Sequence, residues 1–129
     1  MRLMTFFALL TLALAACSGG TSEAAEDGLP PGDSARGAAL FTQTINGAPA
    51  CSTCHTVDGS ASTGPSLQGL AARAATRLAD TPAEAYAYES IAHPAAYIVN
   101  GFGNVMYNQY AQRLQPQQIA DLIAYLLTL

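Results

Sequence analysis

Residues 51–55 read Cys51-Ser52-Thr53-Cys54-His55, and this short stretch decides how the rest of the chain is interpreted. Two cysteines that stand three residues apart on one turn present both thiols to the same side, and the histidine follows directly. The spacing is typical of c-type heme attachment, in which the two heme vinyl groups form thioether bonds and the imidazole binds the iron. The pentapeptide therefore predicts a covalently bound heme.

Three other interpretations stay open on the pentapeptide alone. A disulfide between Cys51 and Cys54 would close a small loop and would stabilise the fold little. A thioredoxin-like redox pair would need neighbouring β-strands, which the sequence does not predict. A zinc site would need four ligands, and adjacent residues such as Cys54 and His55 rarely reach one tetrahedral ion together. Heme attachment is favoured over all three.

Met106 is predicted to be the second axial ligand of that heme. The chain has three methionines, and the other two fall within the first 16 residues. Met106 lies in a glycine-containing stretch without helical periodicity, so the gap-filling role of most buried methionines is a poor fit. A thioether sulfur opposite His55 raises the reduction potential. The alternative ligand is His93, which we expect instead to end a helix before Pro94.

Hydrophobic periodicity over the remaining sequence predicts an all-α domain. No segment alternates apolar and polar residues with period two for long, so strands are not expected. We expect helices over residues 33–43, 67–77, 81–93 and 116–129, and irregular structure over 46–49, 56–66 and 94–113.

Local signals place the ends and the buried faces of these helices. Asp33 or Ser34 caps the first helix. Residues 81–84 (Thr-Pro-Ala-Glu) fit a capping box with proline at the first helical position, and Pro116 opens the last helix. The predicted buried positions follow helical spacing: Leu67, Leu70 and Ala71; Tyr88, Ile91 and Ala92; Ile119, Leu122, Ile123 and Leu126.

The N-terminal region predicts export and a lipid anchor. Residues 1–16 combine an early arginine, a short apolar run and small residues, as secretory signals do, and the run is too short to span a bilayer. Residues 14–17 (Leu-Ala-Ala-Cys) resemble the lipobox of bacterial lipoproteins, in which the cysteine, here Cys17, becomes the lipidated first residue. An ordinary signal with an incidental cysteine is the alternative.

Residues 17–32 are predicted to be a flexible tether, because their one large apolar residue, Leu29, cannot offset the entropy of ordering the segment. The folded domain is then expected over residues 33–129.

Composition limits the partners. Of the 129 residues half are apolar and 11% are charged, which excludes a disordered polyelectrolyte. Five basic residues, all arginine, stand against nine acidic ones. Because phosphate neutralisation supplies most nucleic-acid affinity, we expect no nucleic-acid binding. The acidic balance favours a partner with a basic or apolar docking face.

From about Gly32 to the end, the chain resembles the class I cytochromes c, the small monoheme family. The match runs in order through Gly37 with Phe41, Cys51/Cys54/His55, Gly64-Pro65-Ser66-Leu67, the Met106 loop, and Leu122 with Tyr125.

The resemblance implies a fold and a set of heme contacts. The first and last helices would cross over a covalently bound heme, and Gly37 would let their backbones approach. The Pro65 carbonyl would accept a hydrogen bond from His55 Nδ1–H, which fixes the ring. Leu67 would line one heme face. The family places proline directly after the ligand methionine, and this chain has Tyr107 there, which leaves the loop freer.

A narrower resemblance implies a function. Residues 88–106 and 122–126 are similar to the cytochrome c domains of heme–copper oxidase subunit II and to monoheme lipoprotein subunits of alternative complex III. It implies a one-electron carrier, not an enzyme, without a small-molecule substrate and lipid-anchored on the periplasmic or extracytoplasmic side of a bacterial membrane. Its partners would be respiratory redox proteins, a terminal oxidase or a quinol-oxidising complex. The alternatives are a heme enzyme or gas sensor with an open distal site, and a relay subunit inside a larger complex.

Overall fold

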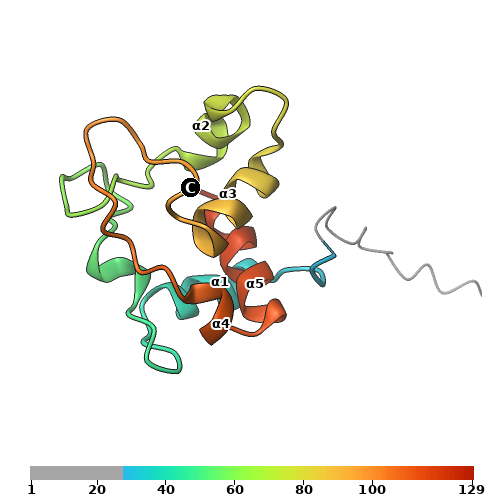
Figure 1. Cartoon of the computed structure of the whole chain (residues 1–129). Helices are drawn as coiled ribbons and strands as arrows, with labels where there is room; N and C mark the ends of the chain where they lie inside the picture. The colour runs from blue at the N-terminus through green and yellow to red at the C-terminus, as the bar shows by residue number, and fades with distance from the viewer. Residues whose placement is uncertain (1–27) are drawn as a thin grey trace, which may run out of the picture.

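The computed structural model describes residues 28–129, which form five α-helices and one 3₁₀ turn joined by loops (Figure 1). They are α1 (Ser34–Phe41), η1 (Cys51–Thr53), α2 (Leu70–Arg77), α3 (Ala83–Ala92), α4 (Tyr110–Arg113) and α5 (Pro116–Leu126). Within this range no β-strand forms, and β-type pairing is limited to an isolated bridge between Ile45 and Ala48. The all-α prediction is confirmed.

The predicted signal peptide, Cys17 and most of the predicted tether fall before residue 28 and so lie outside the described residues. Among the helices that are described, none has the length and apolar character needed to cross a membrane.

The end of the predicted tether packs against α5. Leu29 is buried, and the Pro31 carbonyl accepts a hydrogen bond from Gln117 Nε2 at 2.8 Å. A Cβ on Gly32 would overlap the carbonyl oxygen of Ala120, so the two backbones touch there. The packed domain therefore begins near Leu29, a few residues before the boundary that the sequence predicted.

The first and last helices cross in close contact, as the resemblance implied. A Cβ on Gly37 would overlap the Asp121 carbonyl oxygen, so only glycine permits this approach. Beside the crossing, the rings of Phe41 and Tyr125 pack with centroids 5.5 Å apart. Both helices begin where the sequence predicted, and α1 and α5 end two and three residues earlier than expected.

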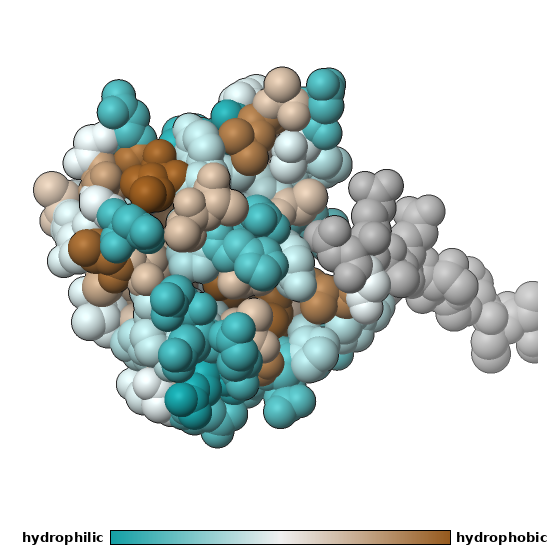
Figure 2. Space-filling model, viewed as in Figure 1, coloured by the Kyte–Doolittle hydropathy of each residue, from teal (hydrophilic) through white to brown (hydrophobic). Residues whose placement is uncertain are grey.

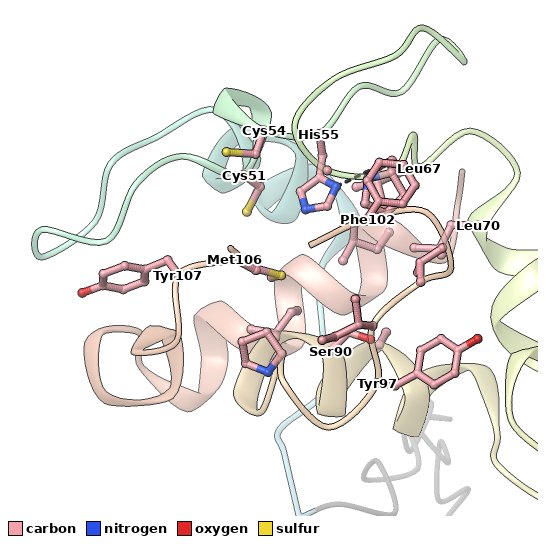
Figure 3. Close-up of a pocket in the computed structure, with 18 of the residues that line it drawn as sticks. Cys51, Cys54, His55, Leu67, Leu70, Ser90, Tyr97, Phe102, Met106 and Tyr107 are labelled. Carbon is pink, nitrogen blue, oxygen red and sulfur yellow. Dashed lines mark hydrogen bonds between the residues drawn. The ribbon is translucent and has the colours of Figure 1, made fainter. Parts of the chain in front are cut away.

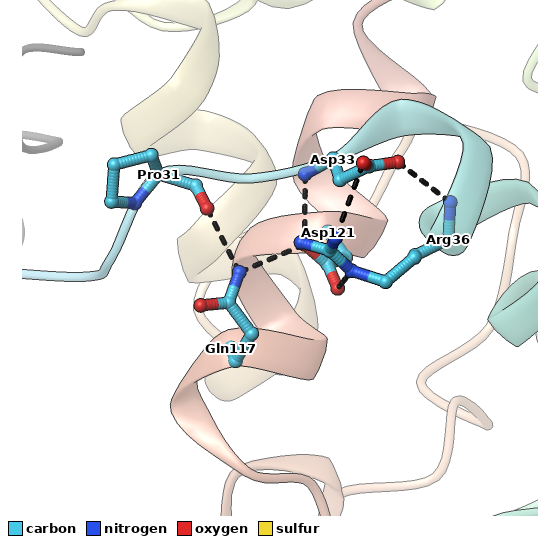
Figure 4. Close-up of polar contacts among 5 residues, drawn as sticks. All are labelled: Pro31, Asp33, Arg36, Gln117 and Asp121. Atoms are coloured by element: carbon cyan, nitrogen blue, oxygen red, sulfur yellow. Dashed lines mark hydrogen bonds and ion pairs between the residues drawn. The ribbon is translucent and has the colours of Figure 1, made fainter. Parts of the chain in front are cut away.

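A buried carboxylate joins this crossing to the N-terminal segment (Figure 4). Asp121 is 2% exposed, and its oxygens accept hydrogen bonds from Arg36 Nε at 2.8 Å, Asp33 N–H at 2.8 Å and Gln117 Nε2 at 2.9 Å. These contacts, the Arg36 hydrogen bond above all, hold the pKa of Asp121 below its usual range. The Asp33 side chain also accepts from Arg36 N–H, which confirms the predicted cap of α1.

The second helix begins three residues later than predicted. Gly69 adopts a left-handed conformation (φ +67°) directly before α2, which ends the preceding turn and leaves Leu67 outside the helix. Leu67 N–H donates instead to the Thr56 carbonyl at 2.7 Å. Leu70 is buried as expected, whereas Leu67 is half-buried.

The predicted capping box at residues 81–84 is wrong. The helix begins at Ala83 with Pro82 as its N-cap, and the Thr81 hydroxyl donates to the Ala79 carbonyl at 3.2 Å rather than capping the helix. Asp80 has a positive φ of 56°, which turns the chain just before the helix and leaves Thr81 outside its first turn.

The buried face of α3 is also shifted from the prediction. Ile91 and Ala92 are buried as expected, but Tyr88 is only half-buried and its predicted place is taken by Tyr86 and Ala87. The helix packs against α2, α4 and α5 at once, so a wider face is covered than a single stripe provides.

A short helix, α4, lies within residues 94–113, all of which were predicted to be irregular. The Tyr110 ring at its start is buried, and its hydroxyl donates to the Pro49 carbonyl at 2.9 Å. Tyr107 packs edge-on against the same ring, with centroids 5.1 Å apart. These contacts with distant residues fix a turn that local periodicity does not show.

Candidate heme-binding site

A cleft of about 410 Å³ opens between the turn that carries the cysteines and the loop that carries Met106 (Figure 3). Its inner wall is apolar, with Leu122 and Leu126 from α5, Ile91 from α3 and Leu70 from α2. All of the predicted heme contacts within the domain line this one cleft: Cys51, Cys54, His55, Pro65, Leu67 and Met106. A cleft of this size and character suits a large planar apolar cofactor.

The cysteine pair lies on η1 at the edge of the cleft. The Cys54 and His55 N–H groups both donate to the Cys51 carbonyl, at 3.1 and 3.0 Å, so one tight turn holds all three side chains together. The two thiols are free and not joined in a disulfide. Burial raises the pKa of the Cys51 thiol to about 11, the opposite of the lowered value of a redox-active thiolate.

A zinc site has no support in the described part of the chain. There, no three His, Cys, Asp or Glu side chains come together as a metal ion would need. Of the four interpretations of the pentapeptide, heme attachment fits the geometry best.

The His55 imidazole is fixed by the loop that follows the pentapeptide. Its Nδ1–H donates to the Pro65 carbonyl at 2.8 Å, the contact that the resemblance implied, which leaves the Nε2 lone pair free for iron. A Cβ on Gly64 would lie 2.5 Å from the ring carbon Cε1, so the backbone touches the flat face of the ring. Gly64 N–H in turn donates to the Cys54 carbonyl at 2.8 Å.

Met106 lies across the cleft from His55. Figure 3 shows its thioether on the wall opposite the imidazole, and the side chain is half-buried against the core. His93, the alternative ligand, is exposed at the C-cap of α3 and does not line the cleft. Of the two alternatives, the structure brings only Met106 to the site, and its ligation of the iron stays a prediction.

Two arginines that were not predicted from the sequence, Arg73 and Arg77, also line the cleft. Arg73 donates to the carbonyls of Ser66, at 2.9 Å, and Gln68, and Arg77 lies over the Tyr86 ring at 6.0 Å. Among the described residues that line the cleft, none is Asp or Glu. Two positive charges facing a cleft without carboxylates suit the anionic propionates of a heme. Their spacing of four residues on one helix is the signal that was available.

The residues present therefore fit a c-type heme in four respects. The cleft is large and apolar, two thiols lie at its edge, the imidazole presents a free nitrogen into it, and the cations in its lining complement propionate groups. The sequence model of the cytochrome c family matches residues 34–129, which is most of the chain. No curated protein matches the chain significantly. The chain belongs to the cytochrome c family, whose members bind a c-type heme covalently and carry electrons.

Proposed function

We propose that this cytochrome is a one-electron carrier of a bacterial respiratory chain, tethered to the outer side of the membrane and not itself an enzyme. The observation that carries the proposal is the position of Met106 opposite His55 in one cleft. If His55 and Met106 both bound the heme iron, no ligand position would be left open for a substrate. The bound heme supplies a one-electron ferric/ferrous couple.

The protein's own residues tune and protect that couple. The Pro65 carbonyl holds the His55 ring in one orientation and raises its basicity as a ligand. Apolar side chains such as Leu67, Leu122 and Leu126 exclude water from the cleft. The exclusion of water lowers the reorganisation energy of each electron transfer. The cleft edge beside Cys51 and Cys54 is the expected port for electrons.

Replacing Met106 tests the carrier function. The ferric holoprotein should show the weak charge-transfer band of sulfur ligation at the red edge of the visible spectrum and should resist added cyanide. Met106→Ala should lose the band, lower the reduction potential and bind cyanide or imidazole, because one axial position opens. Val105→Ala, which trims the exposed neighbouring residue, should keep the spectrum of the wild type. An unchanged spectrum and reduction potential in Met106→Ala would contradict the carrier function and favour the alternative, a heme enzyme or gas sensor with an open distal site.

The membrane location rests on residues 1–17 and on the side from which the chain enters the domain. Residues 28–32 line no part of the cleft, and in Figure 1 they approach α1 and α5 from the side opposite the loops that carry the site. A lipid on Cys17 would therefore leave the cleft edge accessible to a terminal oxidase or a quinol-oxidising complex. Acyl chains contribute roughly 0.8 kcal/mol per buried CH₂, so several chains hold firmly.

Fractionation of cells tests the anchor. Cys17→Ser should move the protein from the membrane fraction to the soluble fraction or leave it unprocessed, whereas the neighbouring Ser18→Ala should not. Intact-mass analysis of the membrane fraction should show a lipid-modified N-terminal cysteine. An unmodified Cys17 there would end the tether proposal.

A further inference from the structure

The loop that carries Met106 has few polar contacts to hold it in place. Among the described residues, residues 103–108 make no hydrogen bond with any part of the chain beyond the adjacent Gln109. The Met106 side chain is half-buried, and its neighbour Val105 is exposed. The position of the sulfur therefore depends on how the two ends of this loop are fixed.

The C-terminal end of the loop is α4, which is too short to be stable by itself. It spans Tyr110–Arg113, and an isolated helix of one turn is not stable in water. Its outer side is polar: Gln109, Gln112 and Arg113 are exposed, and Figure 2 shows hydrophilic residues over α4 at the bottom of that view. Contacts on the inner side of the helix must therefore fix it.

Two hydrogen bonds join α4 to the segment that leads into the pentapeptide. At the first residue of the helix, the Tyr110 hydroxyl donates to the Pro49 carbonyl at 2.9 Å. At its last residue, the Arg113 carbonyl accepts from Asn46 Nδ2 at 2.9 Å. Pro49 precedes Cys51 by two residues, so these bonds connect the two walls of the cleft. We name the two hydrogen bonds the α4 bracket.

Each donor of the bracket is held by its own surroundings. Asn46 and Gly47 both have positive φ, 50° and 83°, in a turn that hydrogen bonds between Ile45 and Ala48 close at 3.0 and 2.8 Å. Asparagine adopts this conformation more readily than most residues. The Tyr110 ring is buried, and burial raises the pKa of its phenol above the ordinary value of 10, so the hydroxyl stays a donor in alkaline solution.

We propose that the α4 bracket positions the sulfur of Met106, with Tyr110 and Asn46 as positioning residues. The proposal rests on the ligation of iron by Met106 put forward above and specifies what holds that ligand. Tyr107, next to Met106, packs edge-on against the Tyr110 ring with centroids 5.1 Å apart, so the bracket reaches the neighbour of the ligand. Without the bracket, the Met106 wall moves away from the cysteine turn more often and admits outside ligands to the iron.

The rate at which the ferric holoprotein captures imidazole, at pH 7 and saturating imidazole, measures this opening. Tyr110→Phe keeps the ring but loses the hydrogen bond, so capture should be about fivefold faster, as expected for one such bond. Asn46→Gly keeps the positive φ, loses the exposed bond to Arg113 and should speed capture about threefold.

Tyr88→Phe is the matched control. Among the described residues, Tyr107 and Tyr110 are the tyrosines whose hydroxyls make hydrogen bonds, and Tyr88 does not line the cleft. Capture in Tyr88→Phe should stay within about twofold of wild type. Equal rates in Tyr110→Phe and Tyr88→Phe would overturn the proposal, and indifference of capture to Asn46→Gly would overturn the role of Asn46.

Asp121→Asn separates local opening from a general loss of stability. It removes a buried carboxylate that joins α1 to α5 and is not part of the bracket. If capture is as fast in Asp121→Asn as in Tyr110→Phe, weaker folding explains the effect and the proposal is overturned.

Cleavage by chymotrypsin after Phe102 measures opening of the same loop without reference to the iron. Phe102 is 37% exposed, and cleavage there should be faster in Tyr110→Phe than in wild type or Tyr88→Phe. The red-edge band of the wild type reports separately on Met106 ligation, so its absence would contradict the carrier function while cleavage still decides whether the bracket holds the loop. Unchanged cleavage in Tyr110→Phe would overturn the bracket whichever residue binds the iron.

Discussion

The imidazole of His55 is held at both its edge and its face, and each contact needs a particular neighbour. The Pro65 carbonyl takes the Nδ1 proton at 2.8 Å, and the absence of a side chain on Gly64 lets the backbone touch the ring. Because a carbonyl oxygen only accepts, this hydrogen bond selects the Nδ1–H tautomer of the neutral ring, in which the Nε2 lone pair faces the cleft.

The two thiols on η1 are predicted to hold the heme covalently. Cys51→Ala combined with Cys54→Ala should remove covalent heme, because no sulfur is left on η1 to form a thioether. Wild-type protein should keep peroxidase-active heme on a denaturing gel and resist extraction by acidic organic solvent, and the double variant should fail both tests. Each single variant should retain one bond and show a shifted pyridine hemochrome band. Freely extractable heme in the wild type would contradict covalent attachment.

Tyr107 stands where the family has proline, directly after the predicted ligand Met106. In the described residues its N–H makes no backbone hydrogen bond, so proline removes no such contact there while restricting φ. Tyr107→Pro should stiffen the Met106 loop and raise the pH at which the sulfur is displaced, followed by the red-edge band in an alkaline titration.

Tyr107→Ala is the matched control, because it also loses the contact with Tyr110 but leaves φ free. Its displacement pH should not rise. If both variants shift the titration alike, backbone restriction is not the cause.

At the scale of elements, the crossing of α1 and α5 depends on one missing methyl group. Gly37→Ala should lower the free energy of unfolding by about 1–3 kcal/mol or more, because a Cβ there overlaps the Asp121 carbonyl and two packed helices must separate. Urea unfolding of the holoprotein measures the loss. Gly103→Ala is the control: its nearest neighbour would be Val105 Cγ1 at 3.6 Å, an ordinary contact, so its stability should change by less than about 1 kcal/mol.

Elements with local causes were predictable from the sequence, and elements with distant causes were not. The Asp33 cap and the apolar spacing of α5 act within a few residues, so both helices begin where expected. The first turn of α4 depends instead on a hydrogen bond between Tyr110 and Pro49, 61 residues apart. The failed capping box at Thr81 shows that a motif is overridden when the preceding backbone turns.

The candidate site likewise contains residues that the sequence predicted and residues that it did not. The cysteines and His55 are adjacent in sequence, so their spacing alone indicated the chemistry, and Met106 was indicated by its isolation. Arg73 and Arg77 were not predicted, because their four-residue spacing shows only that they share a helix face. Whether that face borders a cleft depends on how α2 packs against α3.

For the molecule as a whole, the carboxylate of Asp121 links acid stability to the packing of the N-terminal segment. Its pKa is lowered in the folded state, chiefly by Arg36, so it stabilises the fold at pH values above the ordinary value of 3.8. That contribution is lost as the pH falls through the lower folded pKa, because protonation breaks the pair.

Asp121→Asn should therefore cost about 1–3 kcal/mol of unfolding free energy at pH 7, and the difference from wild type should shrink below pH 4. Urea unfolding across this pH range measures it. Asp80→Asn, which changes an exposed carboxylate, should stay within about 0.5 kcal/mol of wild type at pH 7. A difference for Asp121→Asn that is constant with pH would show that shape rather than charge is at work.

The docking of residues 29–32 on α5 also sets how far the domain can travel. With Cys17 as the anchor proposed above, a fully extended chain reaches about 40 Å to Leu29, against about 55 Å had the packed domain begun at Asp33. The volume within reach scales with the cube of that length and falls to roughly two fifths. An electron acceptor fixed in the same membrane patch would therefore meet the domain at an effective concentration about 2.5-fold higher.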